Sequence, residues 1–247
     1  MEPVTNASIL VVDDEAGDRL RDSVLRGFEW HRAARESRLW REVLEEEVEA
    51  RRQRLRVVLD ALTIDSDRAL EGLLTALTLS DRNLYLHAYR VAALASSVGC
   101  AMQLDDQEMA ALERAALLHD VGKLAMPAAL LRKPAPLTVE ERELVRRHPQ
   151  IGADLIAHIP YLQPAAALVR VAQERPDGLG YPHGARGSAV PIAARIIAVA
   201  DAFDAMTRPR VFRDAITPRE ARLELERCAG TQFDPRVVEV FRKIVQT

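Results

Sequence analysis

Apolar residues recur along most of this chain at the three- and four-residue spacing of one helix face. From residue 64 onward, blocks with this spacing are separated by glycine and proline turn signals. The signals lie at Gly99, Gly122, Pro127, Pro134, Pro136, Gly152, Pro160, Pro164, Gly178 and Gly180. Because no run of alternating apolar and polar residues intervenes, the pattern predicts an all-α domain over residues 64–247.

A heptad-like pattern over residues 29–63 predicts one long helix before that domain. Its apolar face is formed by positions that lie alternately four and three residues apart: Leu44, Val48, Arg51, Leu55, Val58 and Leu62. A coiled-coil stalk that joins two copies in a homodimer is one interpretation, and a surface helix packed on its own domain is the other. Arg51 within the seam counts against the stalk.

The first 28 residues carry the one strand-like run. Residues 9–12 (Ile-Leu-Val-Val) precede the acidic pair Asp13 and Asp14, which resembles the start of a response-regulator receiver domain. The strand–helix units that complete such a domain do not follow. We therefore predict a truncated receiver-like segment over residues 1–28 and no phosphorylation at either aspartate.

Bulk composition narrows the classes of function. The chain of 247 residues is 48% hydrophobic and has a net charge of −3, so no basic field indicates nucleic-acid binding. No apolar run approaches the roughly 18 residues of a membrane span, and no signal-peptide pattern begins the chain. Cys100 and Cys228 lack metal or redox spacing, so we expect buried thiols in a reducing compartment. The sequence predicts a cytoplasmic protein with no membrane or nucleic-acid partner.

The first candidate for chemistry is the pair His119 and Asp120, at the end of an apolar helical run. Gly122 should let the backbone turn, and Lys123 follows at once. An imidazole nitrogen and a carboxylate side by side suit a divalent cation. A helix C-terminus with a favourable histidine is the plainer interpretation. These residues alone leave the two interpretations open.

Further candidates lie on other predicted helices. Asn83 and His87 share a helix face at i and i+4. Asp201 and Asp204 lie three residues apart on an apolar helix, where burial of carboxylates needs a cation or hydrogen bonds. For these two, the alternatives are a metal ligand and an ion pair, with Arg195 as one partner.

Two local signals shape the middle of the domain. Thr138 and Glu141 have capping-box spacing and predict a helix that runs to its end at His148. Residues 172–182 then hold two glycines, two prolines and an Asp-Gly pair, which predict a loop with a defined conformation.

Taken together, these motifs resemble the HD-GYP family of HD phosphohydrolases. They occur in the family's order over residues 81–247 as His87-Ala88-Tyr89-Arg90-Val91, His119-Asp120-Val121-Gly122-Lys123, Leu137-Thr138 with His148-Pro149 and Gly152, Asp177-Gly178-Leu179-Gly180-Tyr181-Pro182, Val199-Ala200-Asp201-Ala202-Phe203-Asp204 and Gly230-Thr231-Gln232-Phe233-Asp234-Pro235. The resemblance implies an HD-type helical bundle with additional C-terminal helices. It also implies cleavage of cyclic di-GMP with iron or manganese ions.

The resemblance assigns roles to individual residues. His87, His119, Asp120 and Asp201 match the ligands of the first metal, and His148 matches a ligand of the second, with Asp120 as the bridge. Lys123 and Asp120 take catalytic positions. The residues expected to bind substrate are Arg210, Asp177, Gly180, Tyr181 and Pro182.

This sequence departs from the family at three positions of the metal sites, and at Val211 and Phe212, where members usually have proline and tyrosine beside the arginine. Ala172 and Gln173 stand where the family has two adjacent histidines of the second metal site. Asn83 stands where some members have a glutamate that supports a third metal. The sequence therefore predicts about one tightly bound iron, manganese or zinc ion per chain.

Three functions remain open at this point. The first is a cyclic di-GMP phosphodiesterase or related nucleotide phosphohydrolase with reduced activity. The second is an inactive module that senses cyclic di-GMP or docks a signalling protein through the loop Gly180-Tyr181-Pro182. The third, a purely structural dimerisation protein, leaves the surviving ligand set unexplained.

Overall fold

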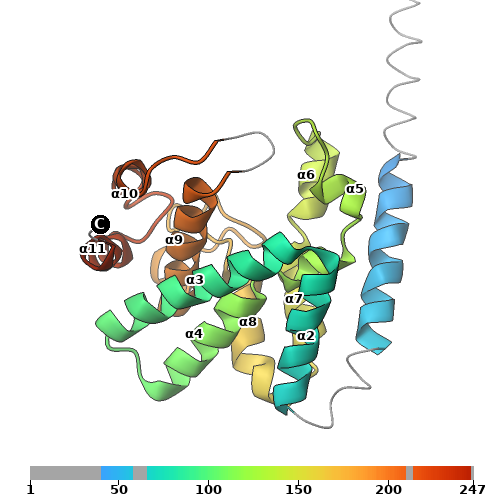
Figure 1. The fold of residues 1–247 in the computed structure, drawn as a ribbon, viewed down its shortest axis with the longest axis horizontal. Helices are drawn as coiled ribbons and strands as arrows, with labels where there is room; N and C mark the ends of the chain where they lie inside the picture. Colours follow the sequence, from blue (N-terminus) through green and yellow to red (C-terminus); the bar gives the residue numbers. More distant parts are fainter. Residues whose placement is uncertain (1–39, 58–65, 210–213, 246–247) are drawn as a thin grey trace, which may run out of the picture. The chain divides into compact units, whose positions relative to one another are not determined.

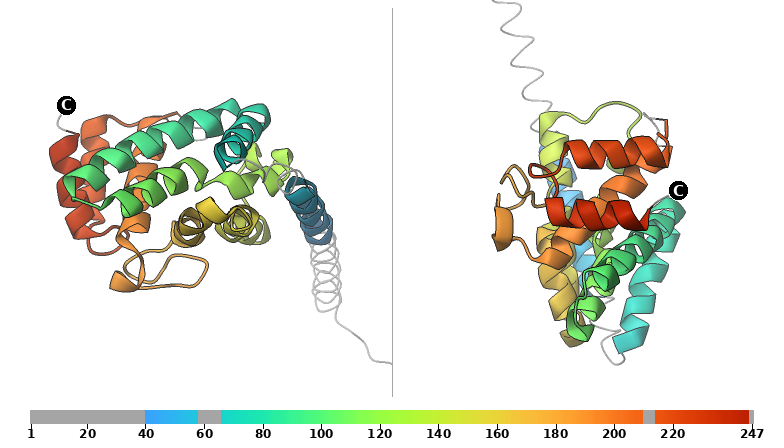
Figure 2. Two further views of the ribbon diagram at one scale, coloured as in Figure 1. Left: turned by 90° about the horizontal axis from the view of Figure 1, so that it is seen from below. Right: turned by 90° about the vertical axis from the view of Figure 1, so that its left-hand side faces the viewer.

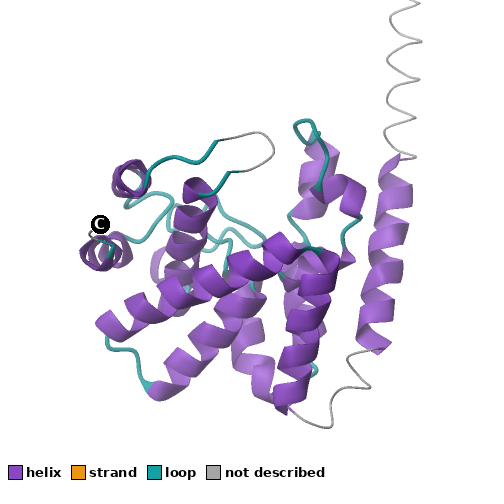
Figure 3. Ribbon diagram, viewed as in Figure 1, coloured by secondary structure: helices purple, strands orange, loops and turns teal. Residues whose placement is uncertain are grey.

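The computed structural model describes residues 40–57, 66–209 and 214–245. Every named element in these ranges is a helix, and the described residues contain no strand beyond an isolated bridge between Ala229 and Phe233 (Figure 3). The all-α prediction is confirmed.

The helices follow one another through short connections (Figure 1). The α-helices after residue 65 are α2 (Ser66–Ser80), α3 (Arg82–Ala101), α4 (Asp106–Leu118), α5 (Ala128–Leu131), α6 (Val139–Val145), α7 (His148–Ile156), α8 (Gln163–Val171), α9 (Ile192–Thr207), α10 (Pro218–Arg227) and α11 (Pro235–Ile244). Short 3₁₀ turns are η1 (Val121–Ala125), η2 (Pro160–Leu162) and η3 (Gly187–Ala189).

Residues 40–57 form a helix, in agreement with the long N-terminal helix expected there. The chain divides into two units, residues 1–44 and 45–247. Within the second unit, Val48 is buried and Arg51 donates a 3.0 Å hydrogen bond to the carbonyl oxygen of Met126. The burial of Val48 and the contact of Arg51 agree with a helix that packs on its own domain. Dimerisation stays a prediction, and the receiver-like segment lies outside the described residues.

The core of the domain is formed where α3, α4 and α9 meet. Alanines lie at this junction, and Ala95, Ala115 and Ala200 are fully buried. Small side chains let the helix axes approach closely. Larger buried side chains such as Leu112 and Ile196 fill the space between the helices around the alanines. This junction brings one face of α3 against the acidic face of α9.

Local signals explain where several helices begin. The predicted capping box of Thr138 and Glu141 is present at the start of α6. That helix ends at Val145, however, and His148 begins α7 instead of ending α6. Pro149 lacks an N–H donor and so fits the first turn of a new helix better than the interior of an old one.

The two thiols are not core residues. Cys100 is exposed in the last turn of α3, and Cys228 is half-buried at the end of α10. The expectation of buried cysteines is therefore wrong, and both residues lie at helix ends.

The C-terminal helices α10 and α11 lie side by side next to α9 (Figure 2). Asp234 caps α11 by accepting hydrogen bonds from the backbone N–H groups of Arg236 and Val237. Its carboxylate also pairs with Arg195 of α9. Across the described ranges, no helix combines the length and apolar character needed to cross a membrane.

Candidate metal centre

Candidate ligands from separate parts of the chain converge beside α3. His87 comes from the middle of α3, His119 from the end of α4, and Asp201 from α9. Ligand atoms of these three side chains all lie within 4.8 Å of one another. Two imidazole nitrogens and a carboxylate oxygen at this separation can hold one divalent cation.

Asp120 is buried between this group and His148. Its Oδ2 atom lies 3.6 Å from Nε2 of His119 and 3.9 Å from Nε2 of His87. Its Oδ1 atom lies 3.3 Å from Nε2 of His148. One oxygen therefore faces the first group of ligands and the other faces the opposite side, as a bridging carboxylate requires.

The orientation of two histidines fits a metal. Nδ1 of His119 donates to the carbonyl oxygen of Ala116, and Nδ1 of His148 donates to that of Val145, each at 2.8 Å. Since a carbonyl only accepts, Nδ1 is the nitrogen that carries the proton in the neutral ring, and Nε2 is the atom available to ligate a cation. Both Nε2 atoms are buried without a hydrogen-bond partner. A cation would satisfy these orphaned nitrogens.

The third histidine lies between two carboxylates. Nδ1 of His87 is 2.7 Å from Oδ2 of Asp204, and Nε2 is 3.1 Å from Oδ1 of Asp201. Burial works to lower the pKa of His87, but the hydrogen bonds to Asp201 and Asp204 outweigh it and raise the pKa to about 9.

The carboxylates are held in their charged form. Burial favours the neutral acids, but Lys123 and the neighbouring histidines hold the pKa of Asp120 well below its usual range. The hydrogen bond from His87 outweighs burial at Asp201 and likewise lowers its pKa. Charged oxygens together with imidazole nitrogens form a donor set suited to iron, manganese or zinc.

Lys123 lies at the same carboxylate, with Nζ 2.5 Å from Oδ2 of Asp120. Its side chain is about one quarter exposed, at 24%, so the ammonium group can reach a ligand beside the centre. The backbone turns at Gly122 as expected, with the N–H of Lys123 bonded to the carbonyl oxygen of Asp120 at 2.9 Å, and the glycine has a second role. A Cβ atom there would lie 2.0 Å from the carbonyl oxygen of His148, so glycine permits the close approach of η1 to α7.

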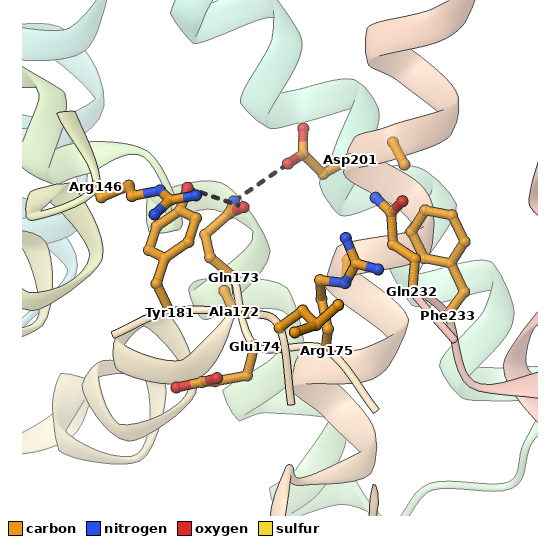
Figure 4. A pocket seen from close by; sticks show the side chains of 13 residues that line it. Arg146, Ala172, Gln173, Glu174, Arg175, Tyr181, Asp201, Gln232 and Phe233 are labelled. Carbon is orange, nitrogen blue, oxygen red and sulfur yellow. Dashed lines mark hydrogen bonds between the residues drawn. The ribbon is translucent and has the colours of Figure 1, made fainter. Parts of the chain in front are cut away.

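At two of the three positions expected to be degenerate, Ala172 and Gln173, the side chains line the same cavity as Asp201. Ala172 is buried at the end of α8 and offers only a methyl group. Gln173 donates through Nε2 to Oδ2 of Asp201 at 3.4 Å and accepts from the Tyr181 hydroxyl at 3.3 Å (Figure 4). The glutamine oxygen is therefore engaged by Tyr181.

The loop after α8 has a defined conformation, as its glycines and prolines predict. Glu174 is buried and accepts backbone N–H hydrogen bonds from His183 at 2.7 Å and Ala185 at 3.0 Å. Gly178 adopts φ +79°, which favours glycine. A Cβ atom at Gly180 would lie 2.5 Å from Cα of Glu174.

The expected substrate residues are only partly brought together. Gly180 and Tyr181 line a cavity of about 290 Å³ that also includes Asp201. Asp177 instead pairs with Arg175 within the loop, and Pro182 is not in the cavity lining. Arg210 lies outside the described residues.

Asn83 and His87 line a second cavity beside the candidate ligands. It has a volume of about 260 Å³ and is also lined by Asp120 and Lys123. The predicted shared helix face of Asn83 and His87 thus opens toward the candidate centre.

Sequence reasoning missed three features that organise the site: the pairing of Asp204, the role of Arg90 and the burial of Glu174. Asp204 pairs with Arg90, at 2.5 and 2.9 Å, and not with Arg195. Arg90 follows His87 by three residues on α3, and this spacing could have indicated that both side chains reach the same carboxylate. Nothing in the sequence pattern distinguishes Glu174 as the buried anchor of its loop.

Comparison with known proteins agrees with this arrangement. The sequence profile of the HD domain matches residues 73–237. The chain belongs to the HD domain family. This family is metal-dependent, as the ligand geometry of this HD domain suggests.

Several phosphodiesterases are similar to this HD domain in sequence. The "Cyclic di-GMP phosphodiesterase response regulator RpfG" of Xanthomonas campestris is 36% identical over 189 residues, which cover 76% of this chain and 50% of that protein. A "Cyclic di-GMP phosphodiesterase" of Thermotoga maritima is 36% identical over 166 residues, which cover 66% of this chain and 45% of that protein. The "3'3'-cGAMP-specific phosphodiesterase 2" of Vibrio cholerae is 32% identical over 177 residues, which cover 71% of this chain and 34% of that protein. The chain spans half or less of the length of these relatives.

Solved structures show the same fold. A cyclic GMP-AMP specific phosphodiesterase of V. cholerae (V-cGAP3) superimposes with a TM-score of 0.58 at 20% identity, covering 72% of this chain and 48% of that one. Bd1817 of Bdellovibrio bacteriovorus, described as an HDG"Y"P protein, superimposes with a TM-score of 0.57 at 18% identity. The match covers 84% of this chain and 70% of that one. At these identities the likeness concerns the fold alone.

Proposed function

We propose that this HD domain is a metal-dependent phosphohydrolase of the HD-GYP type that cleaves cyclic di-GMP or a related cyclic dinucleotide. The convergence of His87, His119 and Asp201 carries the proposal, since their ligand atoms lie within 4.8 Å and Nε2 of His119 is buried without a partner. The names of the similar phosphodiesterases support the substrate class.

His87, His119, Asp120 and Asp201 would hold the first metal. When bound there, a divalent cation lowers the pKa of a water molecule and polarises a phosphoryl oxygen. Asp120 keeps its negative charge because its pKa is strongly lowered, so it can remain a ligand across the physiological pH range. Lys123 would bind a phosphate oxygen, since its ammonium group lies at the edge of the ligand set and is partly exposed.

The second metal position has a poorer donor set. His148 and one oxygen of Asp120 face it. Ala172 supplies no donor, and the carbonyl of Gln173 is engaged by Tyr181. We infer a single tightly held cation and a reduced rate of cleavage, since a second cation would otherwise stabilise charge on the phosphate.

A second candidate function is a catalytically inactive module that binds a cyclic dinucleotide or a signalling protein through the loop at Gly180, Tyr181 and Pro182. The hydrogen bond between Tyr181 and Gln173 favours it, because it joins this loop to the position where a second ligand would lie.

One sample separates the two functions. The full chain is purified, its metal content is measured, and cyclic di-GMP and 3'3'-cGAMP are supplied in turn. Hydrolysis that is lost on chelation and restored by Mn²⁺ supports the enzyme. Dinucleotide binding without hydrolysis by metal-loaded protein would support the inactive module instead.

A further inference from the structure

The three histidines of the candidate centre are oriented in two different ways. His119 and His148 each donate Nδ1–H to a carbonyl oxygen three residues earlier. Each of these carbonyls lies at the end of a helix, where acceptors have lost their helical partners. His87 lies in the middle of α3, where the helix uses its own carbonyls, so it needs an acceptor from another element.

Asp204 of α9 supplies that acceptor. Its Oδ2 atom lies 2.7 Å from Nδ1 of His87, and Asp204 also accepts from Nε and Nη2 of Arg90 at 2.5 and 2.9 Å. The Asp204 residue is only 4% exposed. Three donors thus converge on one buried carboxylate, two of them from an arginine one helical turn after His87.

The spacing on α9 completes the arrangement. Asp201 and Asp204 are one turn apart, and each contacts a different nitrogen of the same imidazole. Asp201 lies on the Nε2 side, where the other ligands are, and Asp204 lies on the Nδ1 side. The ring of His87 is thereby fixed in rotation between two helices.

We propose that Asp204 is a positioning residue of the metal centre and that Arg90 holds it in place. By accepting Nδ1–H, Asp204 directs the Nε2 lone pair of His87 toward Asp201 and His119. This inference rests on the proposed function, since it assigns His87 to the metal. Removal of such a partner behind a ligating histidine lowers metal affinity by roughly 10- to 100-fold.

A plainer role for Asp204 is to join α3 and α9 through its ion pair with Arg90. The chain offers a matched control for that role. Asp234 is also buried and also pairs with an arginine of a neighbouring helix, Arg195, whereas its hydrogen bonds within the described ranges involve no histidine. A loss of stability without a loss of metal affinity is expected when Asp234 is replaced.

The test is calorimetric titration of Mn²⁺ into the chelator-treated full chain, with circular dichroism to verify folding. Asp204→Ala should bind Mn²⁺ about 10- to 100-fold more weakly than the parent chain. The isosteric Asp204→Asn keeps an acceptor oxygen but loses the charge that pairs with Arg90, so it should also bind more weakly, by a smaller factor. Asp234→Ala should bind within about twofold of the parent. Since the asparagine variant retains the side-chain volume, it covers the case in which the alanine variant fails to fold.

Nuclear magnetic resonance of the imidazole nitrogens adds a second readout. With diamagnetic Zn²⁺ bound, the proposal predicts a protonated Nδ1 and an unprotonated, ligating Nε2 for His87 in the parent chain, and loss of this fixed pattern in Asp204→Ala. Folded Asp204 variants with parental affinity, or an equal loss in Asp234→Ala, would overturn the role of Asp204 alone. Failure of the parent chain itself to bind Mn²⁺ would instead overturn the proposed metal centre, and the role of Asp204 with it.

Discussion

Nε2 of His148 lies 3.3 Å from Oδ1 of Asp120, on the side of the carboxylate that faces away from His119. Nδ1 of His148 already donates to Val145, so in the neutral imidazole the nitrogen and oxygen that face each other are both acceptors. A cation between them would turn this repulsion into attraction. The second metal position that we propose would therefore have two donors in place, and two neighbouring positions, Ala172 and Gln173, could not complete it as they stand.

Restoring the missing donors should restore the second metal. In the variant Ala172→His with Gln173→His, we expect the metal content to rise by about one ion per chain and cyclic di-GMP hydrolysis to increase by at least about tenfold. Each single variant serves as a control and should gain less. A folded double variant, supplied with Mn²⁺, that gains neither metal nor activity would contradict the account of the second site.

Removing a ligand of the first metal should have the opposite effect. His119→Ala deletes a buried imidazole whose Nε2 has no other partner, so we expect loss of hydrolysis and metal affinity lowered by at least about 100-fold. Metal titration and a turnover assay measure the two effects. His158→Ala, which alters an exposed histidine, is the matched control and should change neither. Turnover that survives in His119→Ala would place the reaction elsewhere.

Lys123 should act on the substrate and not on metal retention. In Lys123→Met the aliphatic stem is kept and the charge that faces Asp120 is lost. We expect kcat to fall by about 100-fold, as when one donor to a developing phosphate charge is removed, while metal content stays near the parental value. Lys243→Met, at an exposed pair with Glu239, is the control. A variant that loses its metal in proportion to its activity would show that Lys123 supports the ligands instead.

Asp234 should make the C-terminal helices sensitive to acid. Burial opposes its charge, but the hydrogen bonds from Arg195 and from two backbone N–H groups prevail and lower its pKa. A carboxyl whose pKa is lower in the folded state stabilises the fold fully above its unfolded pKa of about 3.9. This contribution decreases below that value and is lost as pH falls through the lower, folded pKa. We expect Asp234→Asn to cost about 2 kcal/mol at pH 7 and less near pH 3.

Denaturant unfolding at both pH values measures that difference. A cost for Asp234→Asn that is the same at pH 7 and at pH 3 would show that the charge of Asp234 contributes nothing.

The helical class was predictable from the sequence because its apolar spacing is strong and its turn signals are regular. The capping box of Thr138 and Glu141 set the start of α6 correctly, yet the end of that helix was misplaced at His148. A proline at position 149 is compatible with a helix end and with a helix start, and only tertiary packing decides between them.

The candidate site was predictable in its residue types and less so in its connections. His87, His119 and Asp201 converge as the motif order suggested. The pairing of Asp204 with Arg90 joins residues 114 positions apart in the chain, so local spacing could not distinguish it from a pairing with Arg195. Burial of Glu174 depends likewise on how its loop folds back over it.

The metal content of freshly purified protein tests the proposed single-metal centre. We predict close to one Fe, Mn or Zn ion per chain, since His87, His119, Asp120 and Asp201 would form a complete ligand set and the neighbouring position lacks donors at Ala172 and Gln173. Two or more tightly bound ions per chain, or none after reconstitution with Mn²⁺, would contradict it.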